Sequence, residues 1–289
     1  MKIIMSRKGF DSSSGGVPSP IFSDGKMLSL PIPSKQSSIK YKDVSWEHTN
    51  LGGIVEQLTN NRIKPSYLAH LDPDLNPASI KRDKGWTPLF GQVSAAQGHL
   101  SNQSICKGDL FLFFGLYRNV TTINNRYYYD SKSLPKHVIW GWLQIGDIIK
   151  IDTCDRKKLK WALYHPHFHR NQDPTNTLYI ASKYLSIDGI KVKIPGAGIF
   201  KYFDNKLQLT KMNSPKVSIW QLPKWFFPNN GKPPLTYHSD IKRWTETNKY
   251  VILNSVNKGQ EFVLNCSIYE QSEKWLLQLF DLVQKQTKS

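Results

Sequence analysis

KGDLFLFFGLYR, residues 107–118, decides the fold of this chain together with a second apolar run, HVIWGWLQIGDIIKI, at residues 137–151. Both runs are rich in aromatic and β-branched residues, and both are too short for a membrane helix. They therefore predict two buried central strands. Gly115, Gly141 and Gly146 lie in these runs, and glycine inside a strand is typical of a bulge or a bend. We expect a tightly curled sheet at the core.

The other apolar patterns predict what surrounds this core. Short runs predict further strands at residues 2–6, 176–185 and 260–264. Helical spacing predicts helices over residues 51–59, 90–103 and 267–286, and Ser267 with Glu270 would form a capping box for the last helix. The fold class is thus α+β, with a curled, largely antiparallel sheet or a partly open barrel and flanking helices. We expect one domain over residues 1–289, with an irregular N-terminal segment at residues 1–50.

The charge of the chain predicts a polyanionic partner. Thirty-nine Lys and Arg stand against 22 Asp and Glu, which gives a net charge of +17, and the excess is concentrated between residues 150 and 260. Nucleic acid and nucleotides are the partners that such a balance favours, although a merely basic surface is the alternative. Trp244 and other aromatic residues are interleaved with these basic residues, a mixture that suits base stacking as well as core packing.

The compartment follows from the cysteines and from the N-terminus. The three cysteines are widely spaced and form no Cys-x-x-Cys pair, so we expect neither a disulfide framework nor a cysteine zinc site. The N-terminal apolar run is too brief for a signal peptide, and no stretch reaches the length of a membrane span. We expect a cytoplasmic protein without membrane contact.

A loop rich in serine and glycine follows the first predicted strand. It begins with Ser6, Arg7 and Lys8 and continues through Ser12 and Ser13 to a pair of glycines. Hydroxyl groups, positive charge and flexible backbone suit the binding of a phosphate group. The loop fits neither the Walker nor the dinucleotide-binding fingerprint, so an ordinary surface loop is the alternative.

Carboxylates and imidazoles supply the candidate catalytic groups. Asp72 and Asp74 flank a proline in HLDPDL, residues 70–75, and paired acids in a loop can act as acid and base, bind a divalent ion or orient a ribose. His165 and His167 alternate in HPHFH, and Pro166 favours an extended segment in which they would share one face. Two imidazoles make only half of a tetrahedral zinc shell, so we expect polar or acid–base chemistry there and no metal centre.

Three further residues complete the candidate site. Asp11 lies in the serine-rich loop, where its carboxylate would join the other two acids. Gln97 belongs to a predicted helix, and an amide both donates to and accepts from base edges. Arg118 follows the first central strand at the rim of the sheet, where a guanidinium could pair with phosphate. We found no motif that identifies a cofactor, so the cofactor stays open.

Several blocks of the chain carry a family resemblance, namely SRKGFDSSSGG at 6–16, PSPI at 18–21, HLDPDL at 70–75, Gln97, GDLFLFFG at 108–115, HPH at 165–167 and QEFVL at 260–264. Together they resemble the third type of bacterial and phage nucleotide-modification-associated domain. The resemblance implies a role in modifying a base or nucleotide, in nucleic-acid modification or phage defence, and it leaves the reaction open. At the level of fold alone, the chain is also similar to barrels of the pseudouridine-synthase-associated type.

Two functions follow as hypotheses from different classes. The first is an enzyme that holds phosphate with the N-terminal Arg/Lys/Ser/Gly loop and reacts through Asp and His side chains. The second is a non-catalytic reader of modified DNA or RNA. An enzyme is favoured if Arg7, Asp11, Asp72, Asp74 and Arg118 converge in one pocket, because a reader needs an aromatic cage and a basic rim but no clustered carboxylates.

Overall fold

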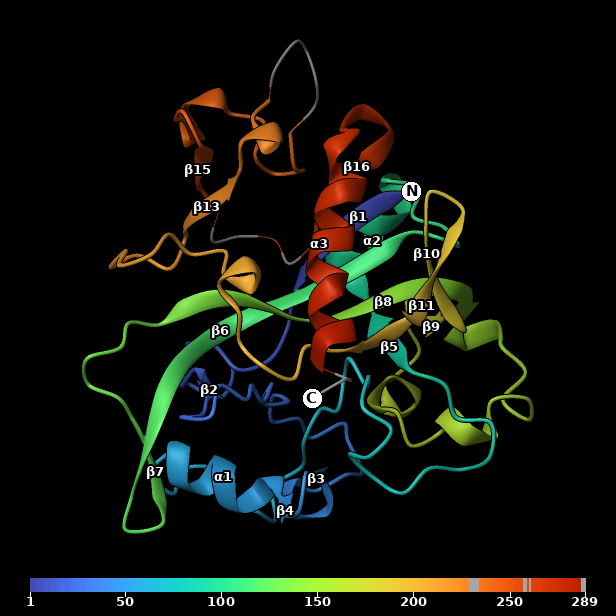
Figure 1. Ribbon diagram of the computed structural model, residues 1–289. Coiled ribbons are helices and arrows are strands. Elements are labelled where there is room, and N and C mark those ends of the chain that lie inside the picture. The colour runs from blue at the N-terminus through green and yellow to red at the C-terminus, as the bar shows by residue number, and fades with distance from the viewer. Residues whose placement is uncertain (229–233, 257–258, 260, 287–289) are drawn as a thin grey trace.

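A sheet of nine strands forms the centre of the computed structural model, which describes residues 1–228, 234–256, 259 and 261–286 (Figure 1). Its strands follow the order β16-β1-β6-β8-β9-β5, with β2 and β7 paired to β6 and β12 paired to β8. Their bounds are Lys2–Arg7 (β1), Ser19–Ile21 (β2), Leu89–Gln92 (β5), Leu110–Ile123 (β6), Arg126–Tyr129 (β7), Lys136–Lys150 (β8), Thr177–Ala181 (β9), Ala197–Ile199 (β12) and Glu261–Asn265 (β16).

The sheet is mixed but largely antiparallel. Strand β6 runs parallel to β1 and to β2, whereas the other strand pairs of the central sheet are antiparallel. Among the described residues no sheet closes into a barrel. The α+β class with a largely antiparallel sheet is therefore confirmed. Of the two predicted architectures, the described residues form the sheet and not the partly open barrel.

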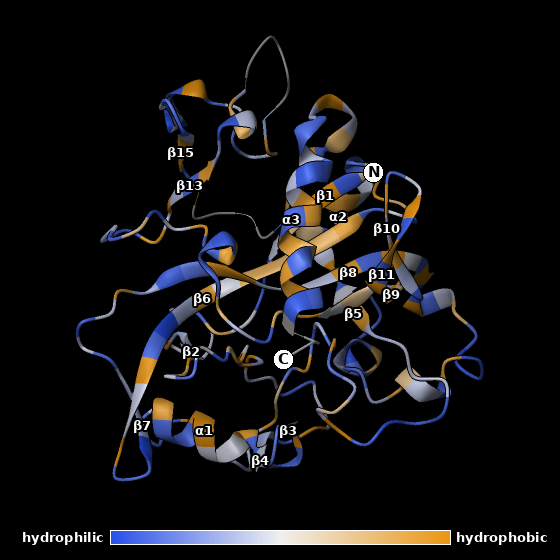
Figure 2. Ribbon diagram, viewed as in Figure 1, coloured by the Kyte–Doolittle hydropathy of each residue, from blue (hydrophilic) through white to orange (hydrophobic). Residues whose placement is uncertain are grey.

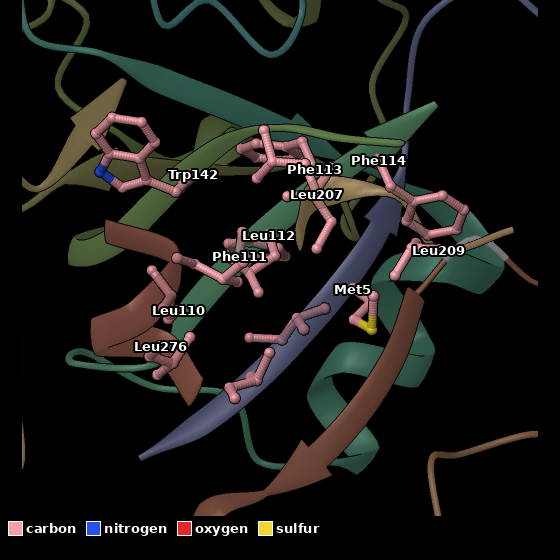
Figure 3. Close-up of a cluster of buried hydrophobic side chains, with 14 of the residues drawn as sticks. Met5, Leu110, Phe111, Leu112, Phe113, Phe114, Trp142, Leu207, Leu209 and Leu276 are labelled. Carbon is pink, nitrogen blue, oxygen red and sulfur yellow. The ribbon is translucent and has the colours of Figure 1, made fainter. Parts of the chain in front are cut away.

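The two apolar runs form the central strands, as predicted. The first six residues of β6 are buried and its last three, which pair with β7, are exposed, a change that Figure 2 shows as orange giving way to blue. Nine successive residues of β8, from His137 to Ile145, are buried beside it. Figure 3 shows Leu110 to Phe114 of β6 in one buried apolar cluster with Met5 of the neighbouring strand β1 and with Leu276. Continuous burial of both faces explains why neither run alternates apolar and polar residues.

Irregular pairing occurs at two of the glycines. The register of β6 against β8 shifts between Phe113 and Phe114, next to Gly141, and that of β8 against β9 shifts around Gly146. Gly115 has another role, since a Cβ there would lie 2.6 Å from the carbonyl oxygen of Lys8. The missing side chain lets β6 pass directly beside the residues that follow β1.

In the described part of the chain three α-helices flank the sheets, and two of them start later than predicted. Helix α1, Leu51–Leu58, is confirmed, and its N-cap Asn50 accepts from the Gly53 N–H at 3.1 Å. The prediction of a helix over residues 90–103 was wrong at its start. Leu89–Gln92 pairs with β9 as strand β5, and α2 spans only Ser94–Asn102. Long-range pairing overrode the local helical pattern there.

The C-terminal helix α3 spans Gln271–Gln286 and lies in front of the central sheet in Figure 1. The predicted capping box at Ser267 was wrong. A 3-10 turn occupies Cys266–Ile268, and the side chain of Asn265 accepts from the N–H of Ser267 at 3.2 Å, which delays the helix. Of the predicted strand at 260–264, Gln260 lies outside the described residues and the rest belongs to β16.

Smaller elements complete the chain. The predicted strand at 176–185 is two strands, because β9 ends at Ala181 and Tyr184–Ile187 (β10) forms a hairpin with Ile190–Pro195 (β11). The other strands are Ser45–Trp46 (β3), Thr49–Asn50 (β4), Ile219–Pro223 (β13), Trp244–Glu246 (β14) and Tyr250–Asn254 (β15). Within the described part of the chain no helix is both long and apolar enough to cross a membrane.

Candidate active site

A polar cavity of about 200 Å³ lies where the loop after β1 meets the start of the HLDPDL segment and the end of β5. Arg7, Asp11, Asp72 and His167 all line it. These four residues are separated by up to 160 positions in the sequence, so the fold rather than local structure brings them together. The parallel pairing of β1 with β6 positions the loop that follows β1, and the pairing of β5 with β9 positions the end of β5.

The serine-rich loop is shaped by its own aspartate. Oδ1 of Asp11 accepts from the N–H and the hydroxyl of Ser13, at 2.8 and 2.7 Å, and from the N–H of Ser14 at 2.8 Å. The carboxylate thus closes a tight turn, as aspartate commonly does. Ser13 and Ser14 line the cavity, whereas Ser12 is exposed and is not among the lining residues.

Arg7 and Lys8 supply positive charge at the cavity wall. Nζ of Lys8 lies 3.0 Å from Oε1 of Glu261, a carboxylate that is 1% exposed and also accepts from the side chain of Gln92. Lys8 therefore balances a buried negative charge. The guanidinium of Arg7 lies 3.5 Å from the carbonyl oxygen of Gly259.

Asp72 is the most enclosed acid of the cavity. Its side chain is 4% exposed, and its Oδ1 accepts from the N–H of Gly91 at 2.9 Å. Three imidazoles surround it: Nε2 of His165 lies 3.3 Å from Oδ1, while Nε2 of His167 and Nε2 of His70 lie 3.3 and 3.5 Å from Oδ2. The carboxylate is thus the centre of a His/Asp cluster, defined here as His70, Asp72, His165 and His167.

The histidines reach this cluster from a turn and not from an extended strand. Pro166–His169 forms a 3-10 helix, so the prediction of an extended segment was wrong. Proline is tolerated in the first turn of a helix because its missing N–H has no partner there. His165 and His167 both reach Asp72, whereas His169 is exposed.

The surroundings of Asp72 favour its charged form. Burial by itself would raise the pKa of this carboxyl, but the three imidazoles packed around it hold the pKa well below its usual range. Burial also lowers the pKa of His165. The cluster therefore presents an ionised carboxylate beside a neutral imidazole, an arrangement that can accept a proton from a bound group.

Asp74 faces a different environment from Asp72. Its two carboxylate oxygens pair with the guanidinium of Arg82 at 2.6 and 2.7 Å, and Oδ2 also accepts from the hydroxyl of Tyr164. Arg82 stacks 4.1 Å from the ring centre of Trp86. Asp74 does not line the polar cavity, and its bonds serve to fix the loop that follows it.

The other predicted site residues lie away from the cavity. Gln97 is buried on α2 and accepts from the hydroxyl of Tyr179 at 3.0 Å, and Ser6 is buried in β1. Arg118 donates to the carbonyl oxygens of Ser133 and Asp130 at 3.0 and 2.9 Å. Trp244 is buried in the sheet of β13, β15 and β14, where its ring N–H donates to a backbone carbonyl.

Sequence reasoning assigned no role to three residues that shape the cluster. His70 contributes an imidazole, Gly91 contributes a backbone donor, and Asn176 holds the ring of His167. The two-residue spacing of His70 and Asp72 was a usable signal, since residues two apart in extended backbone share a face. No local signal identified Gly91 or Asn176, because each acts through a partner distant in sequence.

The fold and the cavity together define an α+β protein with a buried acid–base cluster beside a cationic loop. The chain belongs to the family described as nucleotide modification associated domain 3, whose model matches residues 2–265. The resemblance inferred from the sequence is thereby confirmed, and the family name associates the chain with nucleotide modification. No curated protein and no solved structure matches the chain.

Proposed function

We propose that the chain binds a nucleotide, free or within a nucleic acid, in the polar cavity and modifies it by acid–base chemistry at Asp72. The observation that carries this proposal is that one cavity is lined by the cationic Arg7 and by the carboxylate of Asp72 with its imidazoles. A phosphate and a reacting hydroxyl or ring N–H are the groups that such a pair of surfaces accommodates.

The phosphate would lie on the loop side of the cavity. Arg7 and Arg170 line it together with Ser13 and Ser14, so the two guanidinium groups and the Ser14 hydroxyl are the donors for the phosphate, while the Ser13 hydroxyl donates to Asp11. Charge-assisted hydrogen bonds of this kind are about twice as strong as neutral ones. The carboxylate of Asp11 is engaged by the turn that it closes, which limits its repulsion of a phosphate.

The base has a candidate site behind Asp72. A second cavity of about 80 Å³ adjoins the Asp72–Asn76 segment and is lined by Trp46, Tyr117 and Trp140. The buried ring N–H of Trp140 has no partner among the described residues. Aromatic walls and a donor suit a planar heterocycle, and Asp72 lines both cavities.

A non-catalytic reader is the rival function. Of the five residues whose convergence would favour an enzyme, Arg7, Asp11 and Asp72 line the polar cavity, whereas Asp74 and Arg118 do not. A buried carboxylate surrounded by three imidazoles supports an enzyme, since a site for binding alone gains nothing from enclosing a charge of this kind.

The experiment compares nucleosides from cells that express the wild-type chain or Asp72→Asn, by mass spectrometry, with nucleotide binding measured in parallel by calorimetry. Asp72→Asn should bind nucleotide but yield no modified nucleoside, because the amide keeps the shape and loses the proton acceptor. Arg7→Ala should weaken binding by roughly 1.5–3 kcal/mol. Arg126 is an exposed arginine on β7, and Arg126→Ala is the matched control. It should change neither nucleotide binding nor the amount of modified nucleoside. Modified nucleosides at wild-type levels from Asp72→Asn would contradict the proposal.

A further inference from the structure

We propose that His70, Asp72 and His167 form a binding site for one divalent transition-metal ion. Each of the three residues offers one ligand atom within 4.8 Å of the ligand atoms of the other two, and Nε2 of His70 and Nε2 of His167 lie 3.5 and 3.3 Å from Oδ2 of Asp72. Ligand atoms that are each about 2.1 Å from a tetrahedral ion lie about 3.4 Å apart. The three atoms therefore have the spacing of a ligand set.

The hydrogen bonds of His167 leave a lone pair directed at this point. The side-chain amide of Asn176 donates through Nδ2 to the carbonyl oxygen of His167 at 2.9 Å, so its Oδ1 is the atom that lies 2.7 Å from Nδ1 of the ring. An amide oxygen can only accept, which places the ring proton on Nδ1. In the neutral ring, Nε2 is then an acceptor that faces the carboxylate of Asp72.

Nε2 of His167 and Oδ2 of Asp72 are both acceptors and lie 3.3 Å apart, so a cation must lie between them. A proton can serve, and so can a metal ion bound by both atoms. A metal-bound imidazole ordinarily donates its other N–H to an oxygen acceptor, which is what Asn176 provides.

The two oxygens of Asp72 have separate surroundings. Oδ1 accepts from the N–H of Gly91, and Nε2 of His165 lies 3.3 Å from it. Nδ1 of His165 in turn accepts from the N–H of His167 at 3.4 Å, so the neutral ring of His165 carries its proton on Nε2, toward Asp72. These contacts orient the carboxylate, and Oδ2 is left facing His70 and His167.

Two imidazoles and one carboxylate on one side of an ion select a transition metal over Mg²⁺ or Ca²⁺, which prefer oxygen ligands. The remaining coordination positions would face the polar cavity, since all three ligand residues line it. Open positions are typical of catalytic rather than structural metal sites. The ion deepens the proposed function, because it would act as a Lewis acid toward the bound nucleotide. That use of the ion rests on the proposed function, whereas the binding of the ion does not.

The test strips the full-length chain with a chelator and titrates it with Zn²⁺, and with Fe²⁺ without oxygen, in competition with a fluorescent chelator. One tight equivalent per chain is expected. His70→Ala and His167→Ala should each weaken binding by roughly 100-fold, whereas His169→Ala should leave it unchanged. His169 is the matched control because it is an exposed histidine on the same turn.

Thermal unfolding in metal-free buffer checks that each variant is folded. His70 is the safer substitution, since its side chain is 15% exposed. A second measurement needs no variant. Co²⁺ added to the stripped wild-type chain should give visible d–d absorption bands and, in the NMR spectrum, a paramagnetically shifted ring N–H signal from His167. The hydrogen bond to Asn176 slows the exchange of this proton with water, which makes the signal observable. The proposal is overturned if the wild-type chain binds no equivalent of Zn²⁺ or Fe²⁺, if Co²⁺ shifts no ring N–H signal, or if the folded His70→Ala variant binds the metal ion as tightly as the wild-type chain does.

Ion binding and nucleotide binding can fail separately. Arg7→Ala removes no ligand atom, so it should keep the ion while weakening nucleotide binding. An ion bound as predicted by a chain that binds no nucleotide would uphold the metal site and contradict the proposed function. Nucleotide modification by a stripped chain that binds no ion would contradict the metal site and uphold the proposed function.

Discussion

Gly91 of β5 lies against the ring of His167 so closely that a Cβ on Gly91 would be 2.3 Å from Cδ2 of the imidazole. Carbon atoms of separate residues do not approach to this distance, so either the ring or the strand would have to move. The ring is buried and bonded to Asn176, and the strand is paired with β9. The position of His167 beside Asp72 therefore depends on the absence of a side chain at Gly91.

Gly91→Ala should consequently disrupt the His/Asp cluster. We expect a loss of stability of about 1–3 kcal/mol from overpacking, together with weaker ion binding and no modified nucleoside. Urea unfolding and the Zn²⁺ titration measure the two effects. Gly98→Ala on α2 is the matched control, because a Cβ there meets nothing within 4 Å and alanine favours a helix by up to ~1 kcal/mol. Wild-type ion affinity in Gly91→Ala would refute this role.

Asp74 should act on stability rather than on the site. Removing one member of a buried ion pair leaves the other charge uncompensated, so Asp74→Ala should destabilise the chain by roughly 3–5 kcal/mol. Asp74 also lines the smaller aromatic cavity, but both of its carboxylate oxygens are engaged by Arg82 and Tyr164, so the affinity of the folded variant for a nucleotide should not change. In the double variant Asp74→Ala/Arg82→Met, where both charges are removed, much of the stability should return, a coupling that urea unfolding detects. A folded Asp74→Ala chain that no longer binds nucleotide would place Asp74 in the site instead.

The buried His137 should make stability depend on pH. Burial, reinforced by the charge of Arg7, lowers the pKa of His137 to about 3, and its Nδ1 accepts from the ring N–H of Trp220 at 3.0 Å. The unfolded chain binds a proton at this histidine below its ordinary pKa of about 6.5, while the folded chain does not until about pH 3. This contribution to stability is therefore complete above pH 6.5 and is lost progressively as the pH falls toward 3.

Between pH 7 and pH 4.5 the loss from this one histidine should be about 2–3 kcal/mol. His137→Gln keeps an acceptor for Trp220 and does not titrate, so its free energy of unfolding should fall less steeply with acid. Chemical denaturation of both chains across this pH range measures the difference. Equal slopes for the two chains would show that His137 is protonated in the folded state as readily as in the unfolded one.

The hairpin of β10 and β11 is the surface on which we expect nucleic acid to bind. Exposed Tyr184 lies with Lys183 and Lys191 near its ring, at 5.3 and 5.9 Å from the ring centre, and Lys193 is exposed on the same strand as Lys191. An aromatic ring between cations is typical of base stacking combined with phosphate binding.

Lys191→Ala/Lys193→Ala should weaken binding to DNA or RNA. The slope of log affinity against log salt should become shallower by about 0.9 for each phosphate of duplex DNA that these lysines neutralise in the wild-type chain. Fluorescence anisotropy over a range of salt concentrations measures the slope. Lys35→Ala/Lys40→Ala removes the same charge from exposed positions in the N-terminal segment and should have a smaller effect. If the two pairs behaved alike, net charge rather than this hairpin would account for the binding.

Some features of this protein were determined by local sequence alone. The runs at 110–115 and 137–151 became β6 and β8 because dense aromatic and β-branched residues have few alternatives to a buried strand. The start of α1 also has a local cause, since the side chain of Asn50 accepts from the N–H of Gly53, three residues later. The serine-rich loop also followed β1 as expected, because glycine and aspartate favour turns and the carboxylate of Asp11 accepts from the residues that follow it.

The site itself was decided by the tertiary structure. Asp72 and Asp74 are equivalent in sequence, yet one faces three imidazoles and the other faces Arg82, because the chain on either side packs against different partners. The strand at Leu89–Gln92 has a local helical pattern, and only its pairing with β9 made it a strand and brought Gly91 to Asp72. A metal-ligand set of His70, Asp72 and His167 depends on contacts across nearly 100 residues. Local propensity carries no information about such contacts, since their energies exist only once the sheet has formed.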